Sequence, residues 1–316
     1  MAEQKRIDQP TGTETVGQEW DGIEELNTPL PRWWLWTFYA TIVFAIGYVV
    51  AYPSVPSANG APGGMSNWSS RDNLEKSLEA RQAELKPIHA ALAATDITAL
   101  PGKPELMQQA IAGGAAAFKV HCVQCHGSGA SGAKGYPNLN DDDWLWGGDL
   151  ATIEKTIADG IRQPAHDATR MSQMPAFGRD GILQPAQIED VTSYVRSLSG
   201  QEKTSGSSAR GQALFLANCA VCHGPDGKGS RMVGAPNLTD AIWLYGGDRA
   251  TIAQTITNSR YGVMPAWSLH LDKVTIRMLA AYVHSLGGGE AAPAAAPVQA
   301  AEAAGAPAAG AGNVGG

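Results

Sequence analysis

The longest run of apolar positions lies near the N-terminus, at residues 33–52 (WWLWTFYATIVFAIGYVVAY). It carries no charged residue, and as a helix rising about 1.5 Å per residue it would span roughly 30 Å, the thickness of one bilayer core. Tryptophans begin the run and tyrosines lie near its end, as at two membrane interfaces. The polar leader at residues 1–32 is too long for a cleaved signal peptide. The pattern therefore predicts one retained transmembrane helix.

Charges beside this run predict its orientation. Lys5, Arg6 and Arg32 precede it, whereas residues 53–70 contain no lysine or arginine. Basic residues remain preferentially on the cytoplasmic side of a membrane. We therefore expect a cytoplasmic N-terminus and an exported C-terminal body.

Weaker patterns lie on both sides of the middle of the chain. Residues 53–104 are expected to form a linker with a helical segment, which Pro87 should interrupt. Its apolar positions are Leu74, Leu78, Leu85, Ile88 and Leu92. Residues 288–316 are rich in Ala, Pro and Gly and cannot bury a core, so we expect a disordered tail.

An internal repeat fills most of the remaining sequence. PNL at 137–139 and WLWGGD at 144–149 return 99 residues later as PNL at 236–238 and WLYGGD at 243–248. Met174-Pro175 and Met264-Pro265 lie 90 residues apart, so the first copy carries nine extra residues before its methionine. The repeat predicts two copies of one domain, at residues 105–200 and 207–287.

Both copies begin and end with a helical pattern. Gly114, Phe118 and Cys122 are spaced four apart and share one helical face, where the glycine would let a second helix cross closely. Gly211, Phe215 and Cys219 repeat this spacing in the second copy. Terminal helices are expected at 186–198 and 273–286, with Tyr194 and Tyr282 at matching places. Asp149 and Asp248 are expected to cap the helices that follow them. The fold class is therefore all-α, with one N-terminal transmembrane helix before two helical domains.

All four cysteines lie in two short motifs, HCVQCHG at 121–127 and NCAVCHG at 218–224. A shared zinc site is disfavoured because 93 residues separate Cys125 from Cys219. A thioredoxin-like dithiol would need a preceding strand, and structural disulfides need no adjacent histidine. C-x-x-C-H instead matches covalent haem attachment. The motifs predict two haem c groups bound through thioethers and one axial histidine each. The residues are Cys122, Cys125 and His126 in the first copy, and Cys219, Cys222 and His223 in the second.

The opposite face of each iron needs a second ligand. Met174 and Met264 follow the motifs in both copies, and the proline after each holds its loop extended. A thioether favours Fe(II), and an iron with both axial positions filled suits electron transfer rather than oxygen binding. Met171 lacks both the proline and a counterpart in the repeat. His166, in the nine-residue insert, is a weaker alternative to Met174. Four aromatic residues are expected to wall the haem pockets, namely Trp144, Trp146, Trp243 and Tyr245.

The stretch WDGIEELNTPLPRWWLWTFYATIVFAIGYVVAYP at 20–53, together with CVQCH, CAVCH and the two Met-Pro pairs, resembles the di-haem subunit of cbb₃-type cytochrome c oxidases. The resemblance covers about residues 18–287. It implies two tandem class I cytochrome c domains in the periplasm, held by one helix in the lipid of the bacterial cytoplasmic membrane. In that family the two domains can exchange their axial methionines.

The resemblance also implies a function. The subunit would accept electrons from a donor cytochrome c and relay them to a mono-haem subunit and then to a haem–copper subunit that reduces O₂. It would carry no catalytic site of its own. A formal net charge of −7 and the absence of a basic cluster argue against nucleic acid as a partner.

Two other functions remain open at this point. One is a stand-alone membrane di-haem cytochrome c that serves another respiratory complex. The other is a di-haem peroxidase, which would need one iron with an open or displaceable axial position.

The first prediction concerns cofactor content. The matured intact chain should weigh as much as the polypeptide plus two covalently attached haem groups, measured by mass spectrometry under denaturing conditions. A colourless preparation, or one containing zinc in place of porphyrin, would contradict the assignment.

Overall fold

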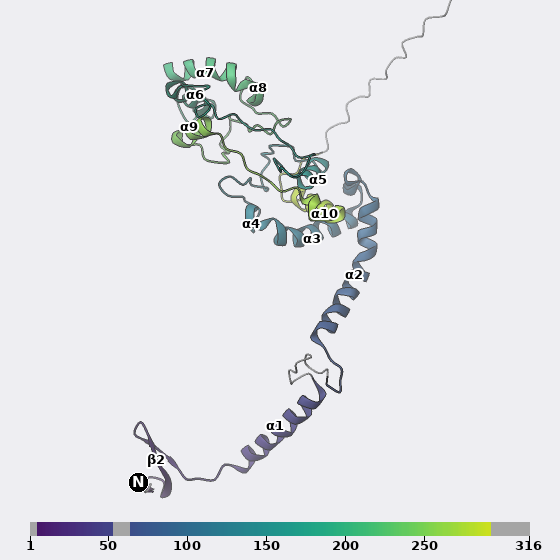
Figure 1. Ribbon diagram of the computed structural model, residues 1–316, viewed down its shortest axis with the longest axis vertical. Helices are drawn as coiled ribbons and strands as arrows, with labels where there is room; N and C mark the ends of the chain where they lie inside the picture. Colours follow the sequence, from purple (N-terminus) through teal and green to yellow (C-terminus); the bar gives the residue numbers. More distant parts are fainter. Residues whose placement is uncertain (1–4, 53–63, 292–316) are drawn as a thin grey trace, which may run out of the picture. The chain divides into compact units, whose positions relative to one another are not determined.

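The computed structural model describes residues 5–52 and 64–291 (Figure 1). It separates into an N-terminal part, up to Glu84, and a C-terminal part that begins at Leu85. The expected disordered tail lies outside the described residues from position 292 onward, as does most of the spacer that follows the apolar run.

The N-terminal part opens with a small antiparallel sheet in the order β1-β2-β3. Its strands are β1 (Ile7–Asp8), β2 (Thr13–Trp20) and β3 (Ile23–Leu26). Asp21 and Gly22 join β2 to β3, with φ of 51° and 85°. Two consecutive positive φ values are typical of the two-residue hairpin turns that Asp-Gly favours. The sheet adds strands to a region that was expected to be only a polar leader.

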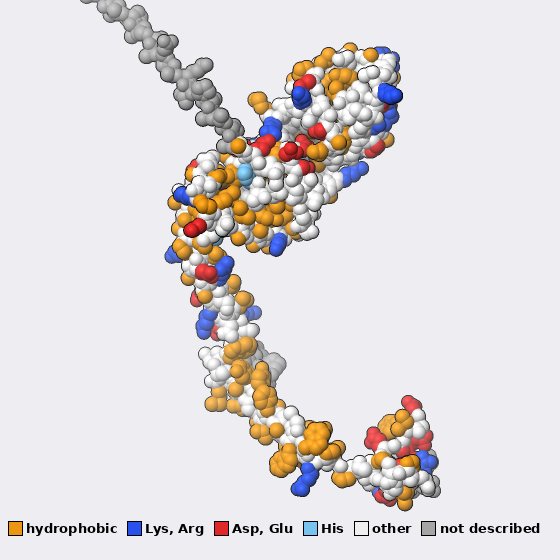
Figure 2. All heavy atoms as spheres, turned by 180° about the vertical axis from the view of Figure 1, so that it is seen from behind, with side chains coloured by type: hydrophobic (Ala, Val, Ile, Leu, Met, Phe, Trp, Pro, Cys, Tyr) orange, Lys and Arg blue, Asp and Glu red, His pale blue; other side chains and the backbone are white. Residues whose placement is uncertain are grey.

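Helix α1 (Arg32–Ala51) coincides with the predicted transmembrane run, one residue earlier. None of its side chains is buried, and Figure 2 shows hydrophobic side chains gathered over it. Among the described residues it is the one helix long and apolar enough to cross a membrane.

Helix α2 (Ser70–Ala94) continues through Pro87, so the predicted interruption was wrong. A proline inside a helix leaves the carbonyl four residues earlier without its N–H donor. Here Pro87 and Ala83 are both exposed, so water can solvate that carbonyl. The helix therefore tolerates the proline on its outer face.

The C-terminal part is a succession of short helices joined by long loops. The predicted caps are confirmed: Asp149 accepts a hydrogen bond from the backbone N–H of Thr152, and Asp248 from that of Thr251. The elements are η1 (Ile97–Gly102), α3 (Pro104–His121), α4 (Val123–His126), α5 (Leu150–Asp159), α6 (Pro185–Leu198), α7 (Gly206–Asn218), α8 (Ala220–His223), α9 (Arg249–Asn258), η2 (Trp267–Leu269) and α10 (Lys273–His284).

These helices pack into two bodies that do not coincide with the two repeats. In body A, α10 of the second copy packs against α3 and α5 of the first. In body B, α6 of the first copy packs against α7 and α9 of the second. Figure 1 shows α10 beside α3 and α6 beside α7. Each copy therefore contributes its terminal helix to the core of the other.

Chain connectivity explains this exchange. Only residues 199–205 join α6 to α7. Helices joined by so short a connection usually become neighbours in space. Once α6 occupies the face of α7, the chain supplies one other terminal helix, α10, to cover α3.

Glycines make both helix crossings close. A Cβ on Gly114 would overlap the carbonyl oxygen of Met278, and a Cβ on Gly211 would overlap that of Asp190. Beside each glycine an aromatic pair fills the core. Phe118 lies 5.3 Å from Tyr282 between ring centroids, and Phe215 lies 5.2 Å from Tyr194. The sequence prediction that these glycines permit close crossing is confirmed.

A buried arginine of α10 binds α5 and the segment that precedes α3. Arg277 pairs with Glu154 of α5 at 3.0 Å and donates to the carbonyl oxygens of Leu92, at 2.7 Å, and Thr95. Leu92 lies in the last turn of α2 and Thr95 directly follows that helix, where a cation also complements the helix dipole. A residue of the second copy thus holds the segment that leads into the first.

Substituting the crossing glycine should weaken body A. Gly114→Ala forces a Cβ against rigid backbone, so we expect the free energy of unfolding to fall by about 1–3 kcal/mol. Gly113→Ala is the matched control, because its Cβ would meet only the flexible thioether of Met278. Thermal denaturation of both variants would test this, and equal melting temperatures would contradict it.

Candidate functional site

Both C-x-x-C-H motifs adopt one tight helical turn at the end of a longer helix. Cys122 ends α3, and its carbonyl oxygen accepts from the backbone N–H of Cys125 at 3.2 Å and of His126 at 2.9 Å. In the second copy, Cys219 accepts in the same way from Cys222 at 3.1 Å and His223 at 3.0 Å. The two motifs therefore share one backbone geometry.

The histidines are held ready for metal ligation. His126 Nδ1 lies 3.1 Å from the carbonyl oxygen of Pro137, and His223 Nδ1 lies 3.1 Å from that of Pro236. A carbonyl can only accept, so Nδ1 carries the proton and Nε2 keeps its lone pair. Burial lowers the pKa of both imidazoles, which favours their neutral form. A second partner that fixes ring and tautomer is typical of metal-bound histidines.

The proline carbonyls were missed by the sequence analysis. Pro137 and Pro236 each begin a PNL triplet, which was used only to set the register of the repeat. The available signal was the same PNL triplet shortly after each motif, with its proline 11 residues after His126 and 13 residues after His223.

The surroundings of the thiols do not suit a redox pair. Burial raises the pKa of Cys122 to about 11, with a smaller contribution from Cys125. Burial likewise raises the pKa of Cys219 to about 11, with Cys222 adding to it. Redox-active dithiols need a lowered pKa on the attacking thiol. A common zinc site is also disfavoured, because the two pairs lie in different bodies and no metal-binding group of three or more His, Cys, Asp or Glu occurs within residues 5–52 and 64–291.

The methionines lie in the bodies opposite to their own repeats. Met264 packs against the body A core together with Cys122, and its backbone pairs with Ile161 through two hydrogen bonds of 3.0 Å. Met174 packs against the body B core, which contains Cys219, and its carbonyl oxygen accepts from Ser259 at 2.6 Å. The structure thus places Met264 at the core that holds the first motif and Met174 at the core that holds the second.

The rival ligands lie elsewhere. His166 faces Asp159, with 3.3 Å between Nε2 and Oδ1, and that carboxylate also pairs with Lys155. Met171 is 65% exposed. Neither residue belongs to a core that contains a cysteine motif.

The four aromatic residues divide into two pairs. Trp144 packs on the body A core and Trp243 on the body B core, as expected of pocket walls. Trp146 and Tyr245 instead contact glycines of the other copy, Gly234 and Gly135 respectively. The two bodies therefore meet through reciprocal aromatic contacts.

One buried indole N–H has no hydrogen-bond acceptor among the described residues. Trp144 donates its indole N–H to the carbonyl oxygen of Gly288 at 2.6 Å. The equivalent N–H of Trp243 is buried without a partner in the described residues. A buried unpaired donor is costly, and a bound group that supplies an acceptor would satisfy it. This observation and the two prepared histidines fit a cofactor in each body.

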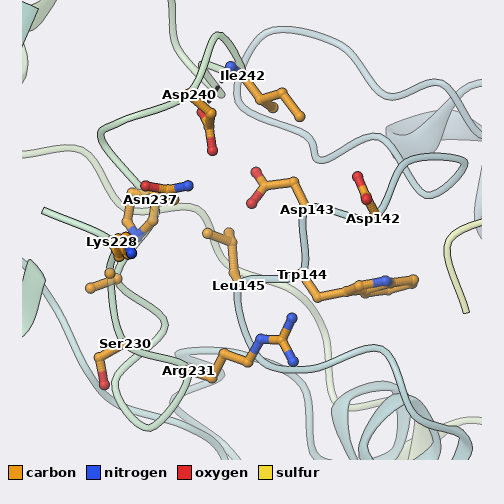
Figure 3. Close-up of a pocket in the computed structure, with 13 residues that line it drawn as sticks. Asp142, Asp143, Trp144, Leu145, Lys228, Ser230, Arg231, Asn237, Asp240 and Ile242 are labelled. Carbon is orange, nitrogen blue, oxygen red and sulfur yellow. Dashed lines mark hydrogen bonds between the residues drawn. The ribbon is translucent and has the colours of Figure 1, made fainter. Parts of the chain in front are cut away.

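A separate cavity of about 390 Å³ lies between the loop at 142–145 and the loop at 228–242 (Figure 3). Asp143 and Asp240 lie on one side of it in the view, and Arg231 lies on the other. Burial raises the pKa of Asp143 to about 6, with further contributions from Asp240 and two neighbouring aspartates that Arg231 opposes.

Family comparisons assign all three regions of the chain. Residues 12–59 match the N-terminal domain of cytochrome oxidase-cbb3, FixP. Residues 111–199 match cytochrome c, and residues 206–283 match cytochrome c oxidase, cbb3-type, subunit III.

Similar proteins cover nearly the whole chain. The cbb3-type cytochrome c oxidase subunit CcoP of Cereibacter sphaeroides is 55% identical over 276 residues, which are 87% of this chain and 95% of that protein. Subunit FixP of a Bradyrhizobium species is 51% identical over 92% of this chain and 100% of its own length. Subunit FixP of Azorhizobium caulinodans is 52% identical over 90% and 96%.

The raised pKa of Asp143 predicts a pH-dependent stability. The unfolded chain releases this proton near the ordinary value of 3.8 and the folded chain near 6, so ionisation favours unfolding as pH rises through that window. Asp143→Asn should therefore raise the melting temperature at pH 7.5 and leave it unchanged near pH 4. Partial exposure limits the gain to about 1 kcal/mol, or about 2–4 °C.

Asp167→Asn provides a control at an exposed aspartate outside the cavity. Its melting temperature should follow that of the parent at both pH values. A stabilisation by Asp143→Asn that is equal at pH 4 and pH 7.5 would contradict the assignment.

Proposed function

Because the chain belongs to the family of the cbb3-type cytochrome c oxidase subunits CcoP and FixP, we propose that each of its two haem c groups is held by the cysteine motif of one repeat and the methionine of the other. The chain is an electron-transfer subunit with two cytochrome c domains, and its cofactors are two haem c groups. Its family membership disfavours both a stand-alone cytochrome and a peroxidase.

The proposed ligand sets follow the two packed bodies. In body A, Cys122 and Cys125 would hold the haem through thioethers, and His126 and Met264 would supply the ligands of its iron. In body B, Cys219 and Cys222 would form the thioethers, and His223 and Met174 would be the iron ligands. The packing of each methionine in the same core as the opposite motif supports this pairing.

Bound haem c supplies a reversible one-electron change between Fe(III) and Fe(II). The chain's residues determine what else can occur there. His126 and His223 are oriented by proline carbonyls, and each methionine sulfur favours the reduced iron. A histidine and a methionine on each iron would leave no position for O₂ or peroxide, so this ligand set would suit electron transfer.

As an oxidase subunit, the chain has other oxidase subunits as partners. We propose that it takes electrons from a donor cytochrome c and passes them to the mono-haem subunit and from there to the haem–copper subunit.

Helix α1 provides the membrane anchor of this subunit. We propose that the N-terminus lies in the cytoplasm of a bacterium and that bodies A and B lie in the periplasm. The basic residues Lys5, Arg6 and Arg32 before α1, and their absence from residues 53–70, support this orientation.

The methionine exchange can be tested by removing one haem at a time. In a chain with Cys219→Ser and Cys222→Ser, only the first motif carries haem. There, Met264→Ala should open the iron to CO in the reduced state and lower its potential, whereas Met174→Ala should change neither. Visible spectra under CO and a redox titration measure both effects.

In the reciprocal chain, with Cys122→Ser and Cys125→Ser, the roles of the two methionines should reverse. Met171→Ala in the intact di-haem chain is the control and should leave both haems closed to CO. If each methionine acted on the haem of its own repeat, the ligands would not be exchanged.

A further inference from the structure

One arginine contacts both methionine segments at equivalent points. Arg162 Nε donates to the carbonyl oxygen of Gly262 at 2.7 Å, and its Nη1 donates to that of Ser172 at 2.8 Å. Gly262 stands two residues before Met264, and Ser172 stands two residues before Met174. A single guanidinium therefore links the two segments that carry the proposed sulfur ligands.

The backbone holds this arginine in place from two directions. It follows Ile161, which pairs with Met264, and its own N–H donates to the carbonyl oxygen of Arg170 at 2.8 Å. Its φ is +54°, a left-handed conformation that side-chain-bearing residues adopt rarely. Strained backbone of this kind persists where the surroundings enforce it, often at functional positions. The residue at the equivalent position of the second repeat is Tyr261, so the cation occurs once for two sites.

The charge of Arg162 has no protein counterion in the described structure. Within residues 85–291, three arginines lack an ion-pair partner: Arg162, Arg170 and Arg260. Arg170 lies over Trp146, 4.9 Å from the ring centroid, and Arg260 lies 5.2 Å from that of Tyr245. Two of these three arginines thus lie over the aromatic residues through which bodies A and B meet.

All three arginines are half-buried, but among the described residues only Arg170 and Arg260 lie over an aromatic ring. Nη2 of Arg162 has no acceptor among these residues. A cation removed from water requires an anion or further hydrogen bonds. Each haem c carries propionate carboxylates, and a guanidinium is the side chain best suited to bind a carboxylate.

We propose that Arg162 is a positioning residue shared by both haem sites, which fixes the two methionine segments and binds a haem propionate with its remaining N–H groups. The inference rests on the proposed pairing of each iron with the methionine of the other repeat. A single positive charge in this place favours the reduced state of both irons.

The test uses the full-length di-haem protein with Arg162→Gln, Arg162→Lys and the control Arg179→Gln. Arg179 is exposed, lies shortly after Met174 and pairs with Asp180. Both haem potentials are measured by redox titration followed in the visible spectrum. The methionine-to-iron charge-transfer band of the oxidised protein reports whether the sulfur ligands remain bound.

Loss of the charge in Arg162→Gln should lower both potentials while the charge-transfer band stays. We expect the reduction equilibrium constant of each haem to fall by about tenfold, equivalent to about 59 mV for one electron. Arg162→Lys keeps the charge and should retain both potentials within about twofold in that constant, equivalent to about 18 mV. Arg179→Gln should change neither potential.

Three results would overturn the proposal. Unchanged potentials in Arg162→Gln, with only a lower melting temperature, would show that Arg162 merely stabilises the loops that it contacts. A shift in one potential alone would show that it is not shared. Equal shifts in the Lys and Gln variants would assign the effect to geometry rather than charge. If the Gln variant fails to mature, a shift of both potentials in Arg162→Lys would overturn the proposal by itself. Failure of the methionine pairing itself would appear separately, as CO binding to the wrong haem in the single-haem methionine variants.

Discussion

Close helix crossing at two glycines is the constraint on which the C-terminal part depends. At Gly114 and Gly211 the backbone of a second helix lies where any larger residue would place its side chain. Each crossing joins helices from different repeats, α3 with α10 and α6 with α7. The terminal helices carry the Met-Pro segments with them, so the same two contacts decide which core each methionine enters.

Sequence patterns predicted the elements better than their partners. The apolar run, the helices of both repeats and the caps at Asp149 and Asp248 all follow from local spacing, which the chain alone determines. Which terminal helix covers which first helix could not be inferred in this way. Both terminal helices present the same apolar spacing and a tyrosine at the same place, so each could fit either glycine face. The short connection at 199–205 distinguishes the two arrangements, and its effect appears only when the chain is placed in space.

The candidate sites show the same division. The motif residues His126 and His223 could be chosen from spacing, because the C-x-x-C-H geometry lies within one helical turn. Their Pro137 and Pro236 partners lie across a loop, and only the fold brings the carbonyl to the ring. His166 in the nine-residue insert was considered as an alternative iron ligand because histidine commonly binds iron. In the structure its imidazole instead faces the carboxylate of Asp159. Arg162 carries no ligand chemistry and was therefore not singled out, although it links both methionine segments.

The exchanged packing also sets the sequence in which the bodies can be completed. Every helix of body B lies between residues 185 and 258, whereas the core of body A begins with Leu92 near the end of α2 and closes only with α10, which ends at His284. Because synthesis proceeds from the N-terminus, the motif at residues 122–126 is made first, but the body that contains it is completed last. Until α10 is made, α3, which ends at that motif, lacks the helix that packs against it. A chain cut short before Met264 would keep every helix of body B and would leave body A without α10.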